Sequence, residues 1–146
     1  MELELESWDT TLRGLHQYAR SVAAALGLKG DSYCAQPDPL ETYLALDGFI
    51  PGFPQRDVAL LWDEQHGWAG AIETACSEDL IVLSYLGEDV LPAPERVARY
   101  ARALLDGAAP GHAVPPTFPA AVRRLLPQRL AQYAATSPVP GLVIGA

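Results

Sequence analysis

The chain has 146 residues, enough for one domain, and its 49% hydrophobic and 19% charged residues are typical of a globular protein rather than a disordered one. A formal net charge of −8 argues against a general nucleic-acid binder, because neutralising phosphates requires clustered Lys and Arg. No run approaches the roughly 18 apolar residues that span a bilayer, and the acidic start MELELESWDTTLRGL is unlike a signal peptide. We therefore expect a cytoplasmic protein.

The charge is spread unevenly along the chain. Residues 1–91 hold 4 basic and 16 acidic residues, a net charge of −12, whereas residues 92–146 hold 6 basic and 2 acidic residues, a net charge of +4. Such asymmetry either steers a charged partner or lets the two parts of one molecule attract each other, and the second is the simpler interpretation.

The first predicted element is a helix over residues 9–26. Apolar residues recur there at spacings of three and four, which places them on one side of a helix: Leu12, Leu15, Ala19, Val22, Ala23 and Leu26. Asp9 or Thr10 suits the N-terminal cap, and Gly27 suits the left-handed residue that ends a helix.

Five strands are predicted next, at DSYCAQ (31–36), ETYLALDG (41–48), DVALLWD (57–63), GWAGAIET (67–74) and EDLIVLSYL (78–86). The third is apolar on both faces, as expected of a central or doubly covered strand. Between the third and fourth, DEQHG predicts a hairpin loop, and FIPGFPQ (49–55) predicts a loop because of its two prolines and glycine. Strands joined by short connections pair antiparallel.

The C-terminal part is predicted to be helical. Pro94 and Glu95 suit the first turn of a helix that ends near Asp106, before Gly107. A Pro-rich linker follows, then a helix over residues 120–135 that Pro127 interrupts, and an apolar tail. We predict an α+β fold in which an antiparallel sheet of about five strands carries the N-terminal and C-terminal helices. Residues 1–107 form the domain, and residues 108–146 pack on it or on a partner.

Two blocks of the sequence resemble a known family. The blocks are ETYLALDGFIPGFPQRDVALLWDEQHGWAGAIE and EDLIVLSYLGEDVLPAPERVARYARALL, with a GFP-containing loop, a strand ending in LLWDE, an HGW turn and an LPAPE helix start. They are similar to an uncharacterised actinobacterial domain-of-unknown-function family, over about residues 12–106. The resemblance implies an actinobacterial source and a cytoplasmic location, and it brings no assigned activity or catalytic residue.

The stretch WDEQHGW (62–68) holds the main candidates for chemistry. Asp63, Glu64 and His66 are residue types that bind metals or move protons, but a metal site needs three or four converging ligands, and a catalytic acid or base needs a pocket. We interpret the stretch as a hairpin tip and expect no metal and no cofactor. Cys34 and Cys76 lack a CxxC partner or a local base, so we expect both to be reduced and half-buried.

Aromatic residues are the better lead to a binding site. Trp62 and Trp68 flank the hairpin and are predicted to pair across strands, and Tyr43, Phe53 and Tyr85 complete the candidate set. Such clusters recognise flat ligands or partner chains, although they are more often core.

Two functions remain open at this point, and a third, DNA-linked regulation through the basic C-terminal region, is less favoured. The first is a non-catalytic binding or regulatory module that acts through a protein partner or through self-association, with a homodimer expected. The alternative is a small enzyme or ligand carrier of an actinobacterial biosynthetic pathway, with a pocket lined by Tyr43, Trp62, Trp68 and Tyr85 and with Asp63 or His66 as its polar group. The arginines at 123, 124 and 129 form a basic cluster, which on an acidic protein is a weak signal for nucleic acid.

Overall fold

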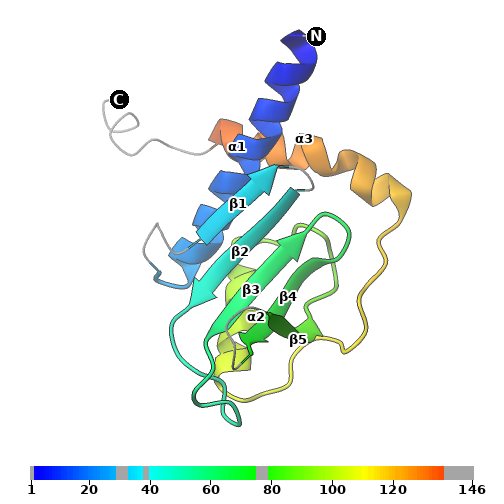
Figure 1. The fold of residues 1–146 in the computed structure, drawn as a ribbon. Coiled ribbons are helices and arrows are strands. Elements are labelled where there is room, and N and C mark those ends of the chain that lie inside the picture. The colour runs from blue at the N-terminus through cyan, green and yellow to red at the C-terminus, as the bar shows by residue number, and fades with distance from the viewer. Residues whose placement is uncertain (1, 29–32, 38–39, 75–78, 137–146) are drawn as a thin grey trace.

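The computed structural model describes residues 2–28, 33–37, 40–74 and 79–136 and shows an α+β fold (Figure 1). One helix precedes five strands and two helices follow them, as the sequence predicts. In chain order the elements are α1 (Glu2–Ala25), β1 (Tyr33–Pro37), β2 (Leu40–Leu46), β3 (Val58–Asp63), β4 (Gly67–Glu73), β5 (Leu80–Tyr85), α2 (Pro94–Leu105) and α3 (Ala120–Thr136). No helix in the described ranges has the length and apolar character needed to cross a membrane.

The strands form one antiparallel sheet in the order β1-β2-β3-β4-β5. Each strand pairs with the next along the chain, because the connections are too short for the crossover that parallel neighbours need. Asp63 pairs with Gly67, and Trp62 lies directly opposite Trp68. The predicted hairpin and its cross-strand tryptophan pair are therefore confirmed, and β3 is the central strand.

One face of the sheet packs against helices, and we call it the covered face. Its large side chains are buried: Leu44, Leu60, Trp62, Trp68 and Ile72 are each at most 2% exposed. Helix α2 reaches this face at Gly70, whose backbone N–H donates to the Tyr100 hydroxyl at 3.0 Å. Figure 1 shows α1 and α2 behind the sheet, with its other face toward the viewer.

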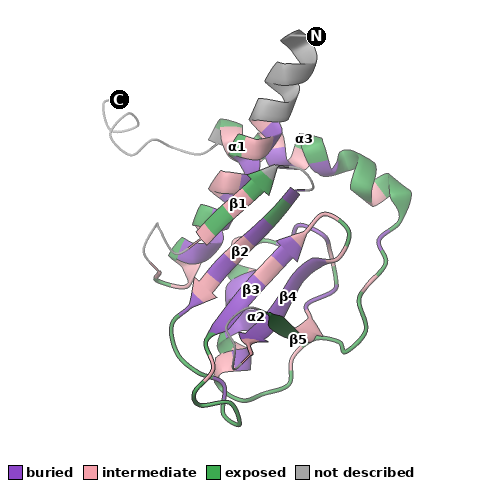
Figure 2. Cartoon of the chain, in the orientation of Figure 1, coloured by how far each residue is buried: buried purple, intermediate pink, exposed green. Residues whose placement is uncertain are grey.

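The opposite face carries the alternate residues of each strand, and we call it the open face because no described element lies over it. Its members are Cys34, Gln36, Glu41, Tyr43, Ala45, Ala59, Leu61, Asp63, Ala69, Ala71, Glu73, Leu80, Val82 and Tyr85. Burial falls from the centre of the sheet to its edges: β3 and β4 are mostly buried, whereas β5 begins with exposed residues (Figure 2).

Helix α1 is longer than predicted. It begins at Glu2 rather than near Asp9. The prediction missed the first turns because the apolar periodicity on which it rested starts only at Leu12. Its end is as predicted: Gly27 has a φ of 76°, and the N–H groups of Gly27 and Leu28 donate to the oxygens of Ala24 and Ala23. This is the Schellman arrangement that satisfies terminal carbonyls. Helix α2 begins at Pro94 as predicted.

Helix α3 packs on α1 and not on the sheet. The Tyr133 ring meets the Tyr18 ring edge-on with centroids 4.9 Å apart. The predicted interruption at Pro127 is wrong, since the helix runs unbroken from Ala120 to Thr136. Proline removes one helical hydrogen bond, but Leu126 and Leu130 on its two sides are both buried, and their packing holds the helix together. The apolar tail, residues 137–146, lies outside the described residues.

The predicted linker between α2 and α3 is attached to the sheet at one point. His112 and Tyr85 exchange two backbone hydrogen bonds, each of 2.8 Å, which form an isolated antiparallel bridge at the end of β5. The segment therefore passes along the outer edge of β5 before it reaches α3 (Figure 1).

Candidate functional site

Two of the predicted aromatic site residues belong to the core. Trp62 and Trp68 are each 1% exposed on the covered face. Their ring N–H groups donate to the backbone oxygen of Val90 at 2.7 Å and to the hydroxyl of Tyr18 at 2.9 Å. Because these bonds satisfy buried donors, the indoles stabilise the fold and are closed to solvent.

The other three aromatic residues lie elsewhere. Tyr43 and Tyr85 are half-buried on the open face, and Phe53, in the loop 49–55, is 39% exposed. The single pocket that the alternative hypothesis builds from the tyrosines and the tryptophans does not form, which corrects that prediction. The reason is strand alternation: Trp62 pairs with Thr42, so the next side chain, Tyr43, points to the opposite face.

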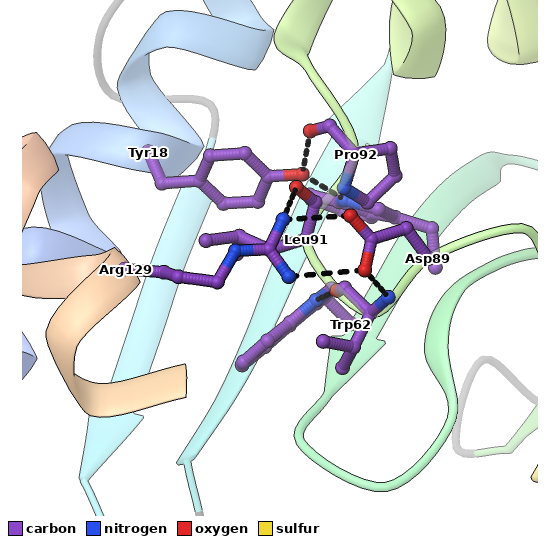
Figure 3. Close-up of polar contacts among 8 residues, drawn as sticks. Tyr18, Trp62, Asp89, Leu91, Pro92 and Arg129 are labelled. Atoms are coloured by element: carbon purple, nitrogen blue, oxygen red, sulfur yellow. Dashed lines mark hydrogen bonds and ion pairs between the residues drawn. The ribbon is translucent and has the colours of Figure 1, made fainter. Parts of the chain in front are cut away.

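Polar contacts on the covered side tie the loop after β5 to two helices (Figure 3). Tyr18 of α1 donates its hydroxyl to the backbone oxygen of Pro92 at 2.5 Å. Arg129 of α3 donates to the two carboxylate oxygens of Asp89 at 3.0 and 2.6 Å, and to the backbone oxygen of Leu91 at 3.0 Å. Such a bidentate arrangement fixes the guanidinium in one orientation.

Sequence reasoning missed this network. It placed Arg129 in a basic surface cluster, whereas the structure pairs it with a carboxylate 40 positions earlier. Nothing local in the sequence marks the pair, because Asp89 reads as an ordinary loop residue and Arg129 as one of three arginines on a helix. The only sequence signal for this pair is the opposite net charge of residues 1–91 and residues 92–146. The simpler interpretation of that difference is attraction between the two parts of the molecule.

The Asp89–Arg129 pair predicts a small loss of stability in acid. Hydrogen bonds from the Arg129 side chain hold the pKa of Asp89 below its usual range, against the opposing effect of burial. A lowered pKa in the folded state stabilises the protein above the unfolded value of about 4, and this contribution disappears as the pH falls below that value. Both side chains are about one-third exposed, so we expect the contribution to be below about 1 kcal/mol.

Urea unfolding between pH 6 and pH 3 measures this contribution. In Arg129→Gln the fall in unfolding free energy over this range should be smaller than in the wild type, and in Arg123→Gln, a substitution at an exposed position, it should be unchanged. Equal pH dependence in all three proteins would show that the pair contributes no proton-linked stability.

The open face carries a groove of about 290 Å³ along β1, β2 and β3. Its walls are the side chains of Cys34, Gln36, Glu41, Tyr43, Leu61 and Asp63, and its floor includes Thr42 and Trp62, whose side chains point to the covered face. Glu41 and Asp63 are cross-strand partners at one end of the groove. The groove therefore combines an aromatic and an aliphatic wall with an acidic end.

A third carboxylate, that of Glu73, lies beyond Tyr43 on the same face. The Tyr43 hydroxyl is 3.4 Å from Oε2 of Glu73, and Arg56 donates to the backbone oxygen of Glu73 at 3.1 Å. Burial and the neighbouring Glu73 carboxylate raise the pKa of Tyr43, which therefore stays a neutral hydrogen-bond donor. Between the acidic ends the centre is apolar and small, because Ala59, Ala69 and Ala71 lie there.

The hairpin tip is a turn, as interpreted from the sequence. Oδ1 of Asp63 accepts the backbone N–H groups of Gln65 and His66 at 2.8 and 2.7 Å, which is the way a short acidic side chain closes a turn. Nδ1 of His66 lies 3.2 Å from the same oxygen. The carboxylate is thus occupied by its own turn. No group of three His, Cys, Asp or Glu residues within the described ranges is placed to hold a metal.

The prediction that both cysteines are half-buried is wrong for Cys34 and is not tested for Cys76. Cys34 is exposed at the wall of the groove rather than half-buried, because β1 is an edge strand and this residue points to the open face. Cys76 lies outside the described residues.

Comparison with known proteins places the chain in a family. A family model described as a family of unknown function (DUF6292) matches residues 18–103, more than half of the chain. Neither the curated proteins nor the solved structures gave a significant match. The matched residues include the whole sheet, Tyr18 and Asp89, but not α3 with Arg129. They also contain the first sequence block quoted above and all but the last two residues of the second. The predicted membership of a domain-of-unknown-function family is therefore confirmed: the chain belongs to the DUF6292 family of unknown function.

Proposed function

We propose that this domain is a non-catalytic binding module that holds a protein partner on the open face of its sheet. The observation that carries the proposal is the one-sided placement of the helices: α1 and α2 cover one face, and no described element covers the other. Antiparallel sheets that leave one face to water usually place polar residues there. Here the middle of that face is apolar: Ala59, Ala69 and Ala71 are each at most 4% exposed, and half-buried Leu61 and exposed Val82 supply its accessible surface.

The charges of the open face indicate the chemistry of the partner. Carboxylates stand at both ends, with Glu41 and Asp63 on one side and Glu73 on the other, and Tyr43 lies between them. A segment with apolar side chains in its middle and Lys or Arg near its ends is complementary to this pattern. Residues 1–91, which build the face, carry a net charge of −12, which attracts such a segment from a distance.

The size of the face limits how the partner binds. Strands of about six residues and five strands in width give a projected area of roughly 400 Å². A stable interface buries about 800 Å² on each partner. The partner therefore has to reach beyond the sheet, and the loop 49–55 at one end of β3 offers Phe49 and Phe53, which are 53% and 39% exposed.

Native mass spectrometry of the protein purified from cells that naturally make it tests this proposal. We expect the wild type to retain a protein partner under gentle conditions and Leu61→Asp to lose it, because a carboxylate in the centre of the face opposes an apolar contact. The matched control is Leu125→Asp on α3, since Leu125 is 52% exposed and lies away from the sheet.

Charge reversal provides a second variant that does not touch the centre of the face. Glu41 is exposed, so Glu41→Lys should fold normally and still weaken the binding of a basic segment, more strongly at low salt. If both variants retained the same partner as the wild type, the open face would not be its binding site. A small molecule retained in place of a protein would instead favour the ligand-carrier function and the groove beside Tyr43.

A further inference from the structure

The outer edge of β5 is the least protected part of the sheet. β5 is the last strand in the sheet order, and apart from the bridge at Tyr85 no strand of the described chain pairs with its outer side. Its first three residues, Leu80, Ile81 and Val82, are 36%, 48% and 38% exposed (Figure 2). Backbone groups and apolar side chains are thus presented together.

Natural sheets rarely leave such an edge bare. Charged residues, prolines or very short strands usually interrupt an edge strand, because an open ladder of N–H and C=O groups pairs with any other strand. The opposite edge follows this rule, since β1 ends in Pro37, which has no N–H to donate. β5 follows it only in part: its pairing with β4 has a register shift at Gly70/Ala71 and His112 covers Tyr85, but LIVLSYLG, residues 80–87, contains no charge and no proline.

We propose that β5 pairs antiparallel with β5 of a second copy of this chain, so that the two sheets join into one across a twofold axis. His112 already occupies the edge at Tyr85, so the open length runs from Leu80 to Ser84. The centre of that length is Val82, which therefore lies on the axis and aligns Leu80 of one copy with Ser84 of the other.

The edge of β5 is the part of the sheet at which charge opposes a second copy least. The protein has a net charge of −8, so two copies repel each other in most relative orientations. Residues 80–87 are uncharged, and the nearest acidic residues, Asp79 and Glu88, flank them. With Val82 on the axis, the new ladder ends where Leu80 of one copy meets Ser84 of the other, because His112 fills the position opposite Tyr85. Asp79 and Glu88 therefore lie outside the paired length. This association uses the edge of the sheet and stands independently of the proposed partner on the open face.

Sedimentation equilibrium of the full chain over a concentration series tests the pairing. We expect the wild type to be a dimer that dissociates on dilution, and Val82→Lys to raise the dissociation constant by about 100-fold or more, since two lysines meet at the axis. Leu125→Lys, at an exposed position of α3, should leave it unchanged. A wild type that stays monomeric at every concentration, or a dimer that Val82→Lys leaves intact, overturns the proposal.

A disulfide crosslink tests the β5 pairing even if Val82→Lys fails to fold. Residues opposite each other in an antiparallel pair have Cβ atoms about 5 Å apart, near the span of a disulfide. In a background with both native cysteines replaced, Cys34→Ser and Cys76→Ser, Val82→Cys should oxidise to a covalent dimer, and Leu125→Cys should not. No crosslink from Val82→Cys, or equal crosslinking from both, counts against the β5 pairing. Leu61→Asp should leave the dimer intact, which separates this test from that of the open face.

Discussion

Replacing Tyr18 with Phe is expected to lower the free energy of unfolding by about 2–4 kcal/mol, because it leaves two buried groups without a partner at about 1–3 kcal/mol each. The Tyr18 hydroxyl accepts the ring N–H of Trp68 and donates to the backbone oxygen of Pro92, and the Tyr18 side chain is fully buried. Phenylalanine fills the same volume, so the loss measures the hydroxyl and not a cavity. Urea unfolding at neutral pH gives the value.

The control for this variant is Tyr133→Phe. Its ring packs on Tyr18, but the residue is half-buried, so water reaches it and a smaller loss is expected. An equal loss in the two variants would show that the buried hydroxyl of Tyr18 contributes no more to the free energy of unfolding than the half-buried hydroxyl of Tyr133.

A pH series adds a second readout for Tyr18. Burial raises the pKa of Tyr18 well above its ordinary value. A raised pKa in the folded state means that stability is complete below the unfolded value of about 10 and falls as the pH rises above it, because the unfolded chain releases the proton. The fall in stability above about pH 10 should therefore be smaller in Tyr18→Phe than in the wild type.

Gly14→Ala is expected to destabilise the protein by about 1–3 kcal/mol, the usual range for overpacking a buried contact. Helix propensity alone predicts the opposite sign, since alanine in place of glycine inside a helix stabilises it by about 1 kcal/mol. The close packing of α3 reverses this expectation: a Cβ at Gly14 would stand 1.8 Å from the backbone oxygen of Leu130. A backbone atom in a packed helix cannot step aside as a side chain can.

Unfolding free energies of Gly14→Ala and Ala24→Gly test this sign. Ala24 is exposed on the same helix, so Ala24→Gly should show the ordinary propensity loss of about 1 kcal/mol. Hydrogen exchange should locate the effect of Gly14→Ala in α3, whose backbone has to move away. A Gly14→Ala protein more stable than the wild type would mean that α1 and α3 are not packed this closely.

The sheet was predictable because its signals are local. Apolar runs of strand length on both sides of DEQHG mark β3 and β4, and a turn of that length sets their register, which places Trp62 opposite Trp68. The pairing of β2 with β3 carries a second signal, which the sequence analysis did not use. Once Trp62 is paired with Thr42, Tyr43 has to point to the other face, and a shared aromatic pocket is excluded.

The choice of covered face could not be read from the strands. β3 is apolar on both sides, with Ala59 and Leu61 on one and Leu60 and Trp62 on the other, so periodicity does not say which side meets the helices. Contacts with residues far along the chain decide which face of the sheet is covered. The Tyr100 hydroxyl binds the backbone of Gly70 from a helix 30 positions later. Helix α3 likewise continues through Pro127 because Leu126 and Leu130, on either side of it, are buried in the core.

The pairing of α1 with α3 has a consequence for synthesis on the ribosome. The five strands and α2 can assemble in the order in which they emerge, because each pairs with an element already made. The side of α1 around Gly14 and Tyr18 stays bare until Leu130 and Tyr133 have left the tunnel. A nascent chain that stops before Arg129 therefore exposes this side of α1, which gives chaperones and proteases a means to distinguish an unfinished molecule from a finished one.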